Sequence, residues 1–188
     1  MRAPRSSALL AGSLAASLLL AGGCGSPSAF TPPPDPRVGK PAPAFVFHSV
    51  HGRVFPSDNL NGRNTFILFM RAGQPDLQTL LREVEKMRND PSFLGVEWMV
   101  LVPENDPLTI PFWTGLHNTL PVALDFTDVA GRFGAGALPL VVIRDQHGII
   151  RLRLDGFVGA QLLPRLAAAR KILREVEGER TRLGGASP

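Results

Sequence analysis

The chain has 188 residues, a formal net charge of +4, four histidines and a single cysteine. Its basic residues are dispersed and no basic-aromatic platform stands out, which argues against a nucleic-acid partner. One cysteine cannot form a disulfide framework, so the folded part must be stabilised by its apolar core. A folded part of about 150 residues can bury such a core as one domain.

The first 23 residues have the pattern of a secretory signal peptide. Arg2 and Arg5 precede an apolar run from Ala8 to Leu20, which is short for a membrane-spanning helix and ends in small residues. The segment Leu20-Ala21-Gly22-Gly23-Cys24 resembles the lipobox of bacterial lipoproteins. That resemblance implies that Cys24 becomes the first residue of the mature protein and carries a lipid. The protein would then be anchored to a membrane, on its periplasmic or extracellular side; ordinary cleavage and an uncleaved anchor are the alternatives.

Composition divides the rest of the chain into three regions. Residues 24–37 are rich in proline and small residues and are predicted to form an extended membrane tether. Residues 38–177 are predicted to form the folded domain, and residues 178–188 a flexible C-terminal tail.

The domain is predicted to open with a β-hairpin, whose strands Phe45 to Val50 and Arg53 to Phe55 are joined around His51-Gly52. The run from Thr65 to Met70 is apolar throughout, which predicts a central strand buried on both faces.

A helix is predicted to start near Gln74, with Pro75 in its first turn and Asp76 complementing its dipole. Its apolar residues recur at helical spacing: Leu77, Leu80, Leu81, Val84 and Met87.

The second half continues the alternation of strands and helices. The segments with strand patterns are Val96 to Val102, Leu120 to Asp125, Leu138 to Ile143 and Ile149 to Leu154. The loop from Pro103 to Pro107 could cap a helix that Pro111 would shorten, and Val129 to Phe133 fits one helical turn. A closing helix from Gln161 to Glu177 would use an apolar face of Leu162, Leu163, Leu166, Ile172, Leu173 and Val176. This order predicts an α/β domain with a partly parallel sheet.

Three segments resemble the redoxin family. Phe69 to Leu77 is similar to its active-site segment Phe-Trp-Ala-x-Trp-Cys-Pro-x-Cys, with Gln74 and Leu77 at the two cysteine positions. Val38 to Phe45 resembles the Gly-x-x-Ala-Pro-x-Phe opening segment, and Gly136-Ala137-Leu138-Pro139 resembles the run that ends at a cis-proline, for which Pro139 is the candidate. The resemblance implies a thioredoxin-like fold, with a central mixed sheet flanked by helices and an N-terminal hairpin extension. The TlpA/ResA-like thiol-disulfide oxidoreductases are the nearest relatives it implies, and AhpC/TSA proteins are more distant.

A second resemblance is to the Cys-Pro-Asp-x-Cys motif of SCO/SenC copper proteins, with Gln74 and Gln78 in place of the cysteines. That family places a copper-binding histidine near the position where this sequence has Ala137-Leu138-Pro139. In both alignments the cysteines that carry the family's chemistry are absent from this sequence, so no catalytic residue, metal ligand or cofactor is predicted.

Without thiols in the domain, enzyme activity is not expected, because disulfide exchange needs a thiolate and the carboxamide of Gln74 does not ionise. Arg71 and Asp76 could suggest acid-base chemistry, but an aspartate at a helix start is usually a dipole partner. The four histidines, His48, His51, His117 and His147, show no metal-ligand spacing.

Binding is the function that remains. The leading hypothesis is a redox-inactive monomer that holds an envelope protein or an extended peptide in a groove formed by Arg71, Ala72, Gly73, Gln74, Pro75, Leu138 and Pro139. One alternative is a remnant domain with an unused groove. The family resemblance implies another, a thiol-disulfide oxidoreductase or peroxiredoxin-like protein, which would need a reactive, unlipidated Cys24. The last is an SCO-like assembly factor that has lost its copper ligands.

Overall fold

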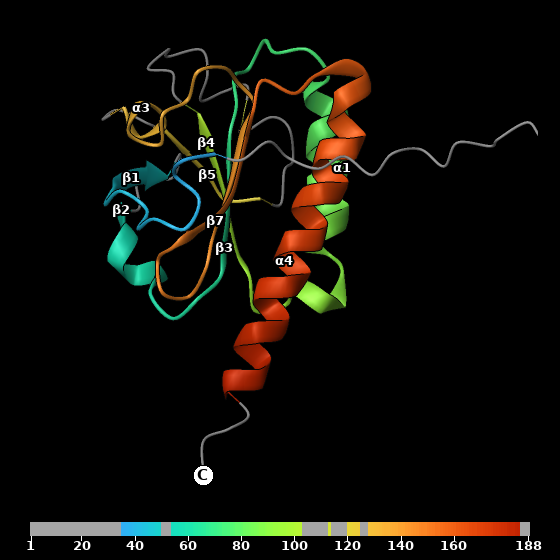
Figure 1. Cartoon of the computed structure of the whole chain (residues 1–188). Coiled ribbons are helices and arrows are strands. Elements are labelled where there is room, and N and C mark those ends of the chain that lie inside the picture. The colour runs from blue at the N-terminus through green and yellow to red at the C-terminus, as the bar shows by residue number, and fades with distance from the viewer. Residues whose placement is uncertain (1–34, 50–53, 103–112, 114–119, 125–127, 185–188) are drawn as a thin grey trace, which may run out of the picture.

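The computed structural model describes residues 35–49, 54–102, 113, 120–124 and 128–184 (Figure 1). The predicted signal peptide, Cys24 and most of the tether lie outside these residues, as do the hairpin turn at 50–53 and the loop from Pro103 to Pro111.

Strands of the described ranges form one mixed sheet in the order β2-β1-β5-β4-β3-β6-β7. They are β1 (Val46–Ser49), β2 (Val54–Pro56), β3 (Thr65–Phe69), β4 (Glu97–Val102), β5 (Val122–Leu124), β6 (Leu140–Arg144) and β7 (Ile150–Asp155). The pairs β3–β4 and β4–β5 are parallel, and the remaining pairs are antiparallel. The predicted α/β class and the added hairpin β1–β2 are therefore confirmed, and β1 joins the hairpin to the sheet through β5.

The longer helices are α1 (Leu77–Arg88) and α4 (Leu162–Gly184), which lie together on one face of the sheet (Figure 1). The shorter helical segments are α3 (Val129–Arg132), η1 (Ser57–Leu60), η2 (Pro91–Phe93) and η3 (Gly159–Gln161). Within the described ranges, none of the helices has the length and apolarity that a membrane crossing requires.

Two apolar clusters cover the two faces of β3, which explains its unbroken apolar sequence. Phe66 and Leu68 pack with the buried side chains of α1 and α4. Ile67 and Phe69 point to the opposite face, where they join residues of the hairpin and of α3, and Phe133, which directly follows α3. Every residue of β3 is buried, as expected for a central strand covered on both faces.

Helix α1 begins three residues later than predicted. Asp76 has φ 60° and ψ 13°, a left-handed conformation that cannot be part of a right-handed helix. Pro75 therefore lies before the helix, and the prediction that it occupies the first turn was wrong. The side chain of Asp76 does not cap α1 either.

Helix α4 continues to Gly184, so residues 178–184 are helical and the predicted flexible tail was wrong for them. Ion pairs hold this extension: Glu177 pairs with Arg180 within the helix, and Glu179 pairs with Arg151 of β7. Leu163, predicted to be apolar core, is 56% exposed, and the fully buried Ala169 was not predicted to be core.

The folded part also starts earlier than residue 38. Asp35 forms an ion pair with Arg153 at 2.8 Å, and Gly39 and Lys40 form backbone hydrogen bonds with Ile150. Residues 35–37, assigned to the tether from composition, are therefore part of the domain.

Candidate binding groove

The loop that follows β3 is closed by Gln74. The amide of Met70 still donates to the carbonyl of Leu101, after which the chain leaves the sheet. The side-chain Oε1 of Gln74 then accepts a hydrogen bond of 3.1 Å from the backbone N–H of Arg71. The backbone N–H of Gln74 donates to the carbonyl of Arg71 at 3.4 Å. Gln74 thus fixes the shape of this loop.

The predicted groove has two walls, the loop Arg71–Pro75 and the segment Leu138-Pro139, and the second lies beside the first. Phe69, the last residue of β3, pairs with Leu140, the first residue of β6, so the residues that follow and precede them are neighbours. The peptide bond between Leu138 and Pro139 is cis. The structure therefore brings the two predicted walls together at the end of β3, and partner binding between them stays a prediction.

The side chains at positions 74, 77 and 78 differ in environment. Leu77 is 7% exposed and packs in the core beneath α1, whereas Gln78 is exposed. Gln74 is half-buried; its Nε2 atom is buried and has no hydrogen-bond partner among the described residues. An unsatisfied buried donor is costly, but a bound partner cannot reach this atom while the side chain keeps its present position.

The segment between β7 and α4, which sequence reasoning did not include, contacts the residue before α1. Oδ2 of Asp76 accepts a hydrogen bond of 2.6 Å from the N–H of Gly159, which ties this segment to the start of α1. Val158, the residue before Gly159, is 39% exposed, and Leu163, in the first turn of α4, is 56% exposed. The available signal was the pair of glycines at 156 and 159 just before a predicted helix.

Arg153 of β7, also missed, holds the groove's end of the molecule together. Its side chain is 6% exposed. The guanidinium donates to the carbonyls of Phe133 and Gly134, in the loop that leads to Pro139, and to the carboxylates of Asp35 and Asp155. A buried arginine with four partners links three segments that are distant in sequence, and no local sequence pattern reveals it.

The contact with Arg153 contributes to a shift in the pKa of Asp35. Burial raises its pKa, but hydrogen bonds from the Arg37 amide and from the Arg153 guanidinium, together with the charge of both arginines, lower it more. The net pKa of Asp35 lies below its ordinary value, so that the pair is ionised at neutral pH.

No family model matches the sequence, and no curated protein is found that is similar to it in sequence. Solved structures do match. A protein described as a thiol:disulfide interchange protein DsbE from Chlorobium tepidum is 17% identical, with a TM-score of 0.63 over 72% of this chain and 97% of that one. The exposed lipoprotein thioredoxin Etrx1 of Streptococcus pneumoniae is 14% identical, with a TM-score of 0.57 over 69% and 99%. A secreted disulfide oxidoreductase of Mycobacterium tuberculosis is 12% identical, with a TM-score of 0.56 over 70% and 95%.

The chain has a thioredoxin-like fold. At these identities the likeness establishes the fold alone, so what these proteins do remains a statement about them. Within the thioredoxin-like fold, the end of β3 and the start of α1 form the junction where a helix N-terminus can stabilise a thiolate. Here that junction carries Gln74, and the one cysteine of the chain is Cys24.

Of the four histidines of the chain, the structure describes two. His48 is exposed on β1, His147 is exposed in the turn after β6, and His51 and His117 lie outside the described residues. Where the structure is described, no three His, Cys, Asp or Glu side chains are grouped as metal ligands would be.

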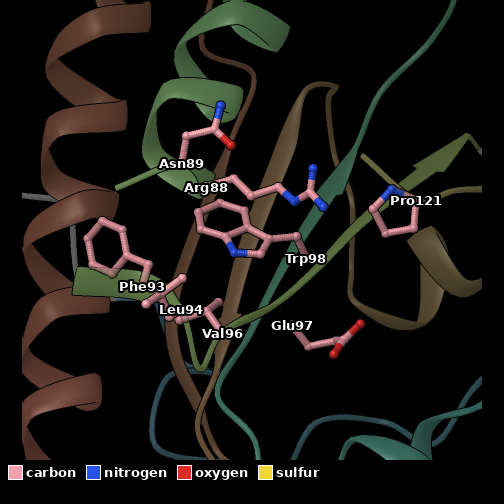
Figure 2. Close-up of a pocket in the computed structure, with 8 residues that line it drawn as sticks. All are labelled: Arg88, Asn89, Phe93, Leu94, Val96, Glu97, Trp98 and Pro121. Atoms are coloured by element: carbon pink, nitrogen blue, oxygen red, sulfur yellow. The ribbon is translucent and has the colours of Figure 1, made fainter. Parts of the chain in front are cut away.

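A separate pocket of about 500 Å³ lies at the opposite end of the sheet, where α1 ends and β4 begins. It is lined by Arg88, Asn89, Phe93, Leu94, Val96, Glu97, Trp98 and Pro121 (Figure 2). None of the predicted site residues belongs to it, and its one cation, one anion and two aromatic side chains indicate no single ligand class.

Proposed function

We propose that this protein is a lipid-anchored, extracytoplasmic thioredoxin-fold module that binds an extended segment of a protein and has no thiol chemistry. The observation that carries the proposal is the replacement of both expected thiols by Gln74 and Leu77, in a chain whose only cysteine is in the lipobox-like segment. Disulfide exchange and peroxide reduction both start from a thiolate, and the domain contains no group that could supply one.

The geometry of the groove supports binding. An extended peptide can bind beside the edge of a backbone segment through strand-like hydrogen bonds, which require no thiol. Val158, which is exposed next to the contact between Gly159 and Asp76, offers apolar surface close to the start of α1.

Two observations support the location. The lipobox-like segment ends at Cys24, and two structurally similar proteins are described as an exposed lipoprotein and as a secreted protein. Labelling with radioactive palmitate, present in the wild type and lost in Cys24→Ala, would support lipidation. Labelling that persists in the variant would contradict it.

The binding function is tested by a photoreactive residue at position 74 in the lipidated protein, with a matched probe at Leu94, which is 86% exposed at the far end. We expect one protein to be crosslinked by the probe at 74 and not by the probe at 94. Identical products from both probes, or none with the fold intact, would favour the remnant-domain alternative.

The oxidoreductase alternative is favoured by the descriptions of the structural neighbours and is tested separately. We expect the purified domain, residues 35–188, to reduce neither insulin disulfides nor peroxide. The variant Gln74→Cys/Leu77→Cys, which restores both thiols at the start of α1, is the matched control for the assay. Turnover by the unmodified domain would overturn the proposal.

A further inference from the structure

A strap formed by residues 35–42, the first residues that the structure describes, lies against β7. The N–H of Gly39 donates to the carbonyl of Ile150 at 2.8 Å, and the N–H of Ile150 donates to the carbonyl of Lys40 at 2.9 Å. Residues 36–41 are exposed, so the strap contributes little to the apolar core. A segment held mainly by backbone hydrogen bonds opens at a smaller free energy than the whole fold. The strap can therefore detach while the sheet stays folded.

Two side chains of the strap reach the loop that follows α3. Asp35 forms its ion pair of 2.8 Å with Arg153, in the middle of β7. The guanidinium of Arg37 occupies the space in which a side chain at Gly134 would lie. Arg153 itself donates to the carbonyls of Phe133 and Gly134. The strap and this loop are thus linked through one buried guanidinium.

The same loop continues into the groove wall Leu138-Pro139. Residues 136–138 form no backbone hydrogen bond with another described residue. The carboxylate of Asp155 lies beside Gly136, at 3.7 Å from the place that a Cβ atom would take there. Asp155 is itself held by Arg153 at 3.0 Å. Arg153 therefore supports the segment before the wall twice, directly at residue 134 and through Asp155 at residue 136.

Release of the strap would change the hydrogen bonding of Arg153. Within the described residues its Nη1 donates to Asp35 alone, and its side chain is 6% exposed. A buried donor without an acceptor is costly, so the guanidinium would turn toward the carboxylate of Asp155, which is 38% exposed and open to water. This movement takes it away from the two loop carbonyls. The wall would keep the packing of Leu138 against the core but lose part of its support.

We propose that the strap is a switch for the groove. The docked strap keeps the wall Leu138-Pro139 in the shape that binds a partner, and release of the strap loosens the wall and weakens binding. By linkage, a segment bound against the wall tightens the docking of the strap by the same factor. The effect on binding rests on the proposed function, whereas the coupling between strap and wall can be measured without a partner.

Hydrogen exchange in the full chain measures this coupling, because different amides report the strap, the wall and the core. The amide of Ile150 donates to the strap. The amides of Ala135 and Gly156, here called the wall amides, are hydrogen-bonded in the loop before the wall and to Pro139. The amide of Val100 is hydrogen-bonded in the sheet and reports unfolding of the core.

Two variants weaken the strap at different points. Gly39→Ala leaves Asp35 and Arg153 intact, and it strains the strap because alanine is unfavourable at the φ of 84° that Gly39 adopts. We expect exchange at Ile150 to become several-fold faster and exchange at the wall amides to rise with it. Asp35→Ala should have the same effect through the other anchor of the strap. Faster exchange at Ile150 with unchanged wall amides, in both variants, would overturn the coupling.

Glu179→Ala is the matched control. It removes a carboxylate from Arg151, which keeps Asp145 as a partner, just as Asp35→Ala removes one of the two carboxylates of Arg153. We expect this variant to lower the stability of the fold, seen as faster exchange at Val100, and to leave the wall amides unchanged. Wall amides that accelerate equally in the control would mean that the wall opens only with the whole fold, which would also overturn the switch.

The photoreactive residue at position 74 measures the consequence for binding. We expect the yield of the specific crosslink to fall several-fold in Gly39→Ala and to stay unchanged in Glu179→Ala. A yield in Gly39→Ala equal to that of the wild type, with coupled exchange as expected, would overturn the role of the strap in binding. Absence of any specific crosslink in the wild type would instead contradict the proposed binding function, and hydrogen exchange would still decide whether strap and wall are coupled.

Discussion

Asp76 combines an unusual backbone conformation with a contact to the segment that precedes α4. Its left-handed φ of 60° is tolerated by a short polar side chain, and its Oδ2 accepts the N–H of Gly159 at 2.6 Å. We expect Asp76→Ala to lower the free energy of unfolding by about 1–3 kcal/mol, because it loses the hydrogen bond and keeps the strained backbone. Asp76→Gly should cost less, since glycine adopts this conformation freely. Urea unfolding measures both, and the prediction fails if the glycine variant is the less stable.

Asp35 gives the stability a defined dependence on pH. Its pKa is lower in the folded protein than in the unfolded chain, where it is about 3.9. The carboxylate therefore stabilises the fold above that value, and its contribution is lost as the pH falls through the lower folded pKa. We expect Asp35→Asn to be less stable than the wild type at pH ~6 and the difference to shrink as the pH approaches ~3. Thermal unfolding at several pH values measures it, and a difference that stays constant would contradict the assignment.

At the level of single residues, the resemblance placed the two segments that the structure brings together, the loop after β3 and Leu138-Pro139, but the contacts that support them were missed. Gln74 and Pro139 could be placed because motif positions are local in sequence. Arg153 could not, because its partners include a residue 118 positions away and two carbonyl groups, which no pattern of side chains encodes. The left-handed Asp76 was missed for a related reason, since the contact with Gly159 is 83 residues away.

The secondary-structure elements, too, were predicted well where their cause is local in sequence and poorly where it is distant. Buried strands such as β3 and β4 were predicted well, because burial on both faces leaves an unbroken apolar run. The end of α4 was not, because its last residues are polar and include Gly178, which reads locally as a helix end. What extends the helix is pairing with distant groups: Glu177 accepts from Asn64 Nδ2 at 2.6 Å, and Glu179 pairs with Arg151.

Truncation of α4 tests how much this extension contributes. Removal of residues 178–188 takes Arg180 away from the buried carboxylate of Glu177, which is 5% exposed, and Glu179 away from Arg151. We expect the free energy of unfolding to fall by about 2–4 kcal/mol, because a buried charge keeps only part of its compensation. Removal of residues 185–188 is the control and should have little effect. Equal stability of the two truncated chains in urea would show that the extension is not needed.

At the scale of the whole molecule, the residues from Asp35 to Ala42 serve two purposes in one place. They cover part of the outer edge of β7, which would otherwise present unpaired N–H and C=O groups to other chains. They also carry Asp35 to Arg153, in the middle of β7, and so fix where the described part of the chain begins on the sheet. The boundary of the domain is therefore set by hydrogen bonding to an edge strand, which the proline-rich composition of this region conceals.

Two chains that start at different residues separate these contributions. A domain of residues 35–188 should fold as the full chain does, whereas a domain of residues 43–188 exposes the β7 edge and leaves Arg153 without the carboxylate of Asp35. We expect the shorter domain to lose about 3–5 kcal/mol of stability, as when one partner of a buried ion pair is removed, and to associate through the open edge. Urea unfolding and sedimentation measure the two effects.

The control is a domain of residues 35–188 that carries Asp35→Asn. Its β7 edge stays covered, so this variant should lose stability and remain monomeric. Association of that variant would place the cause in the ion pair and not in the open edge.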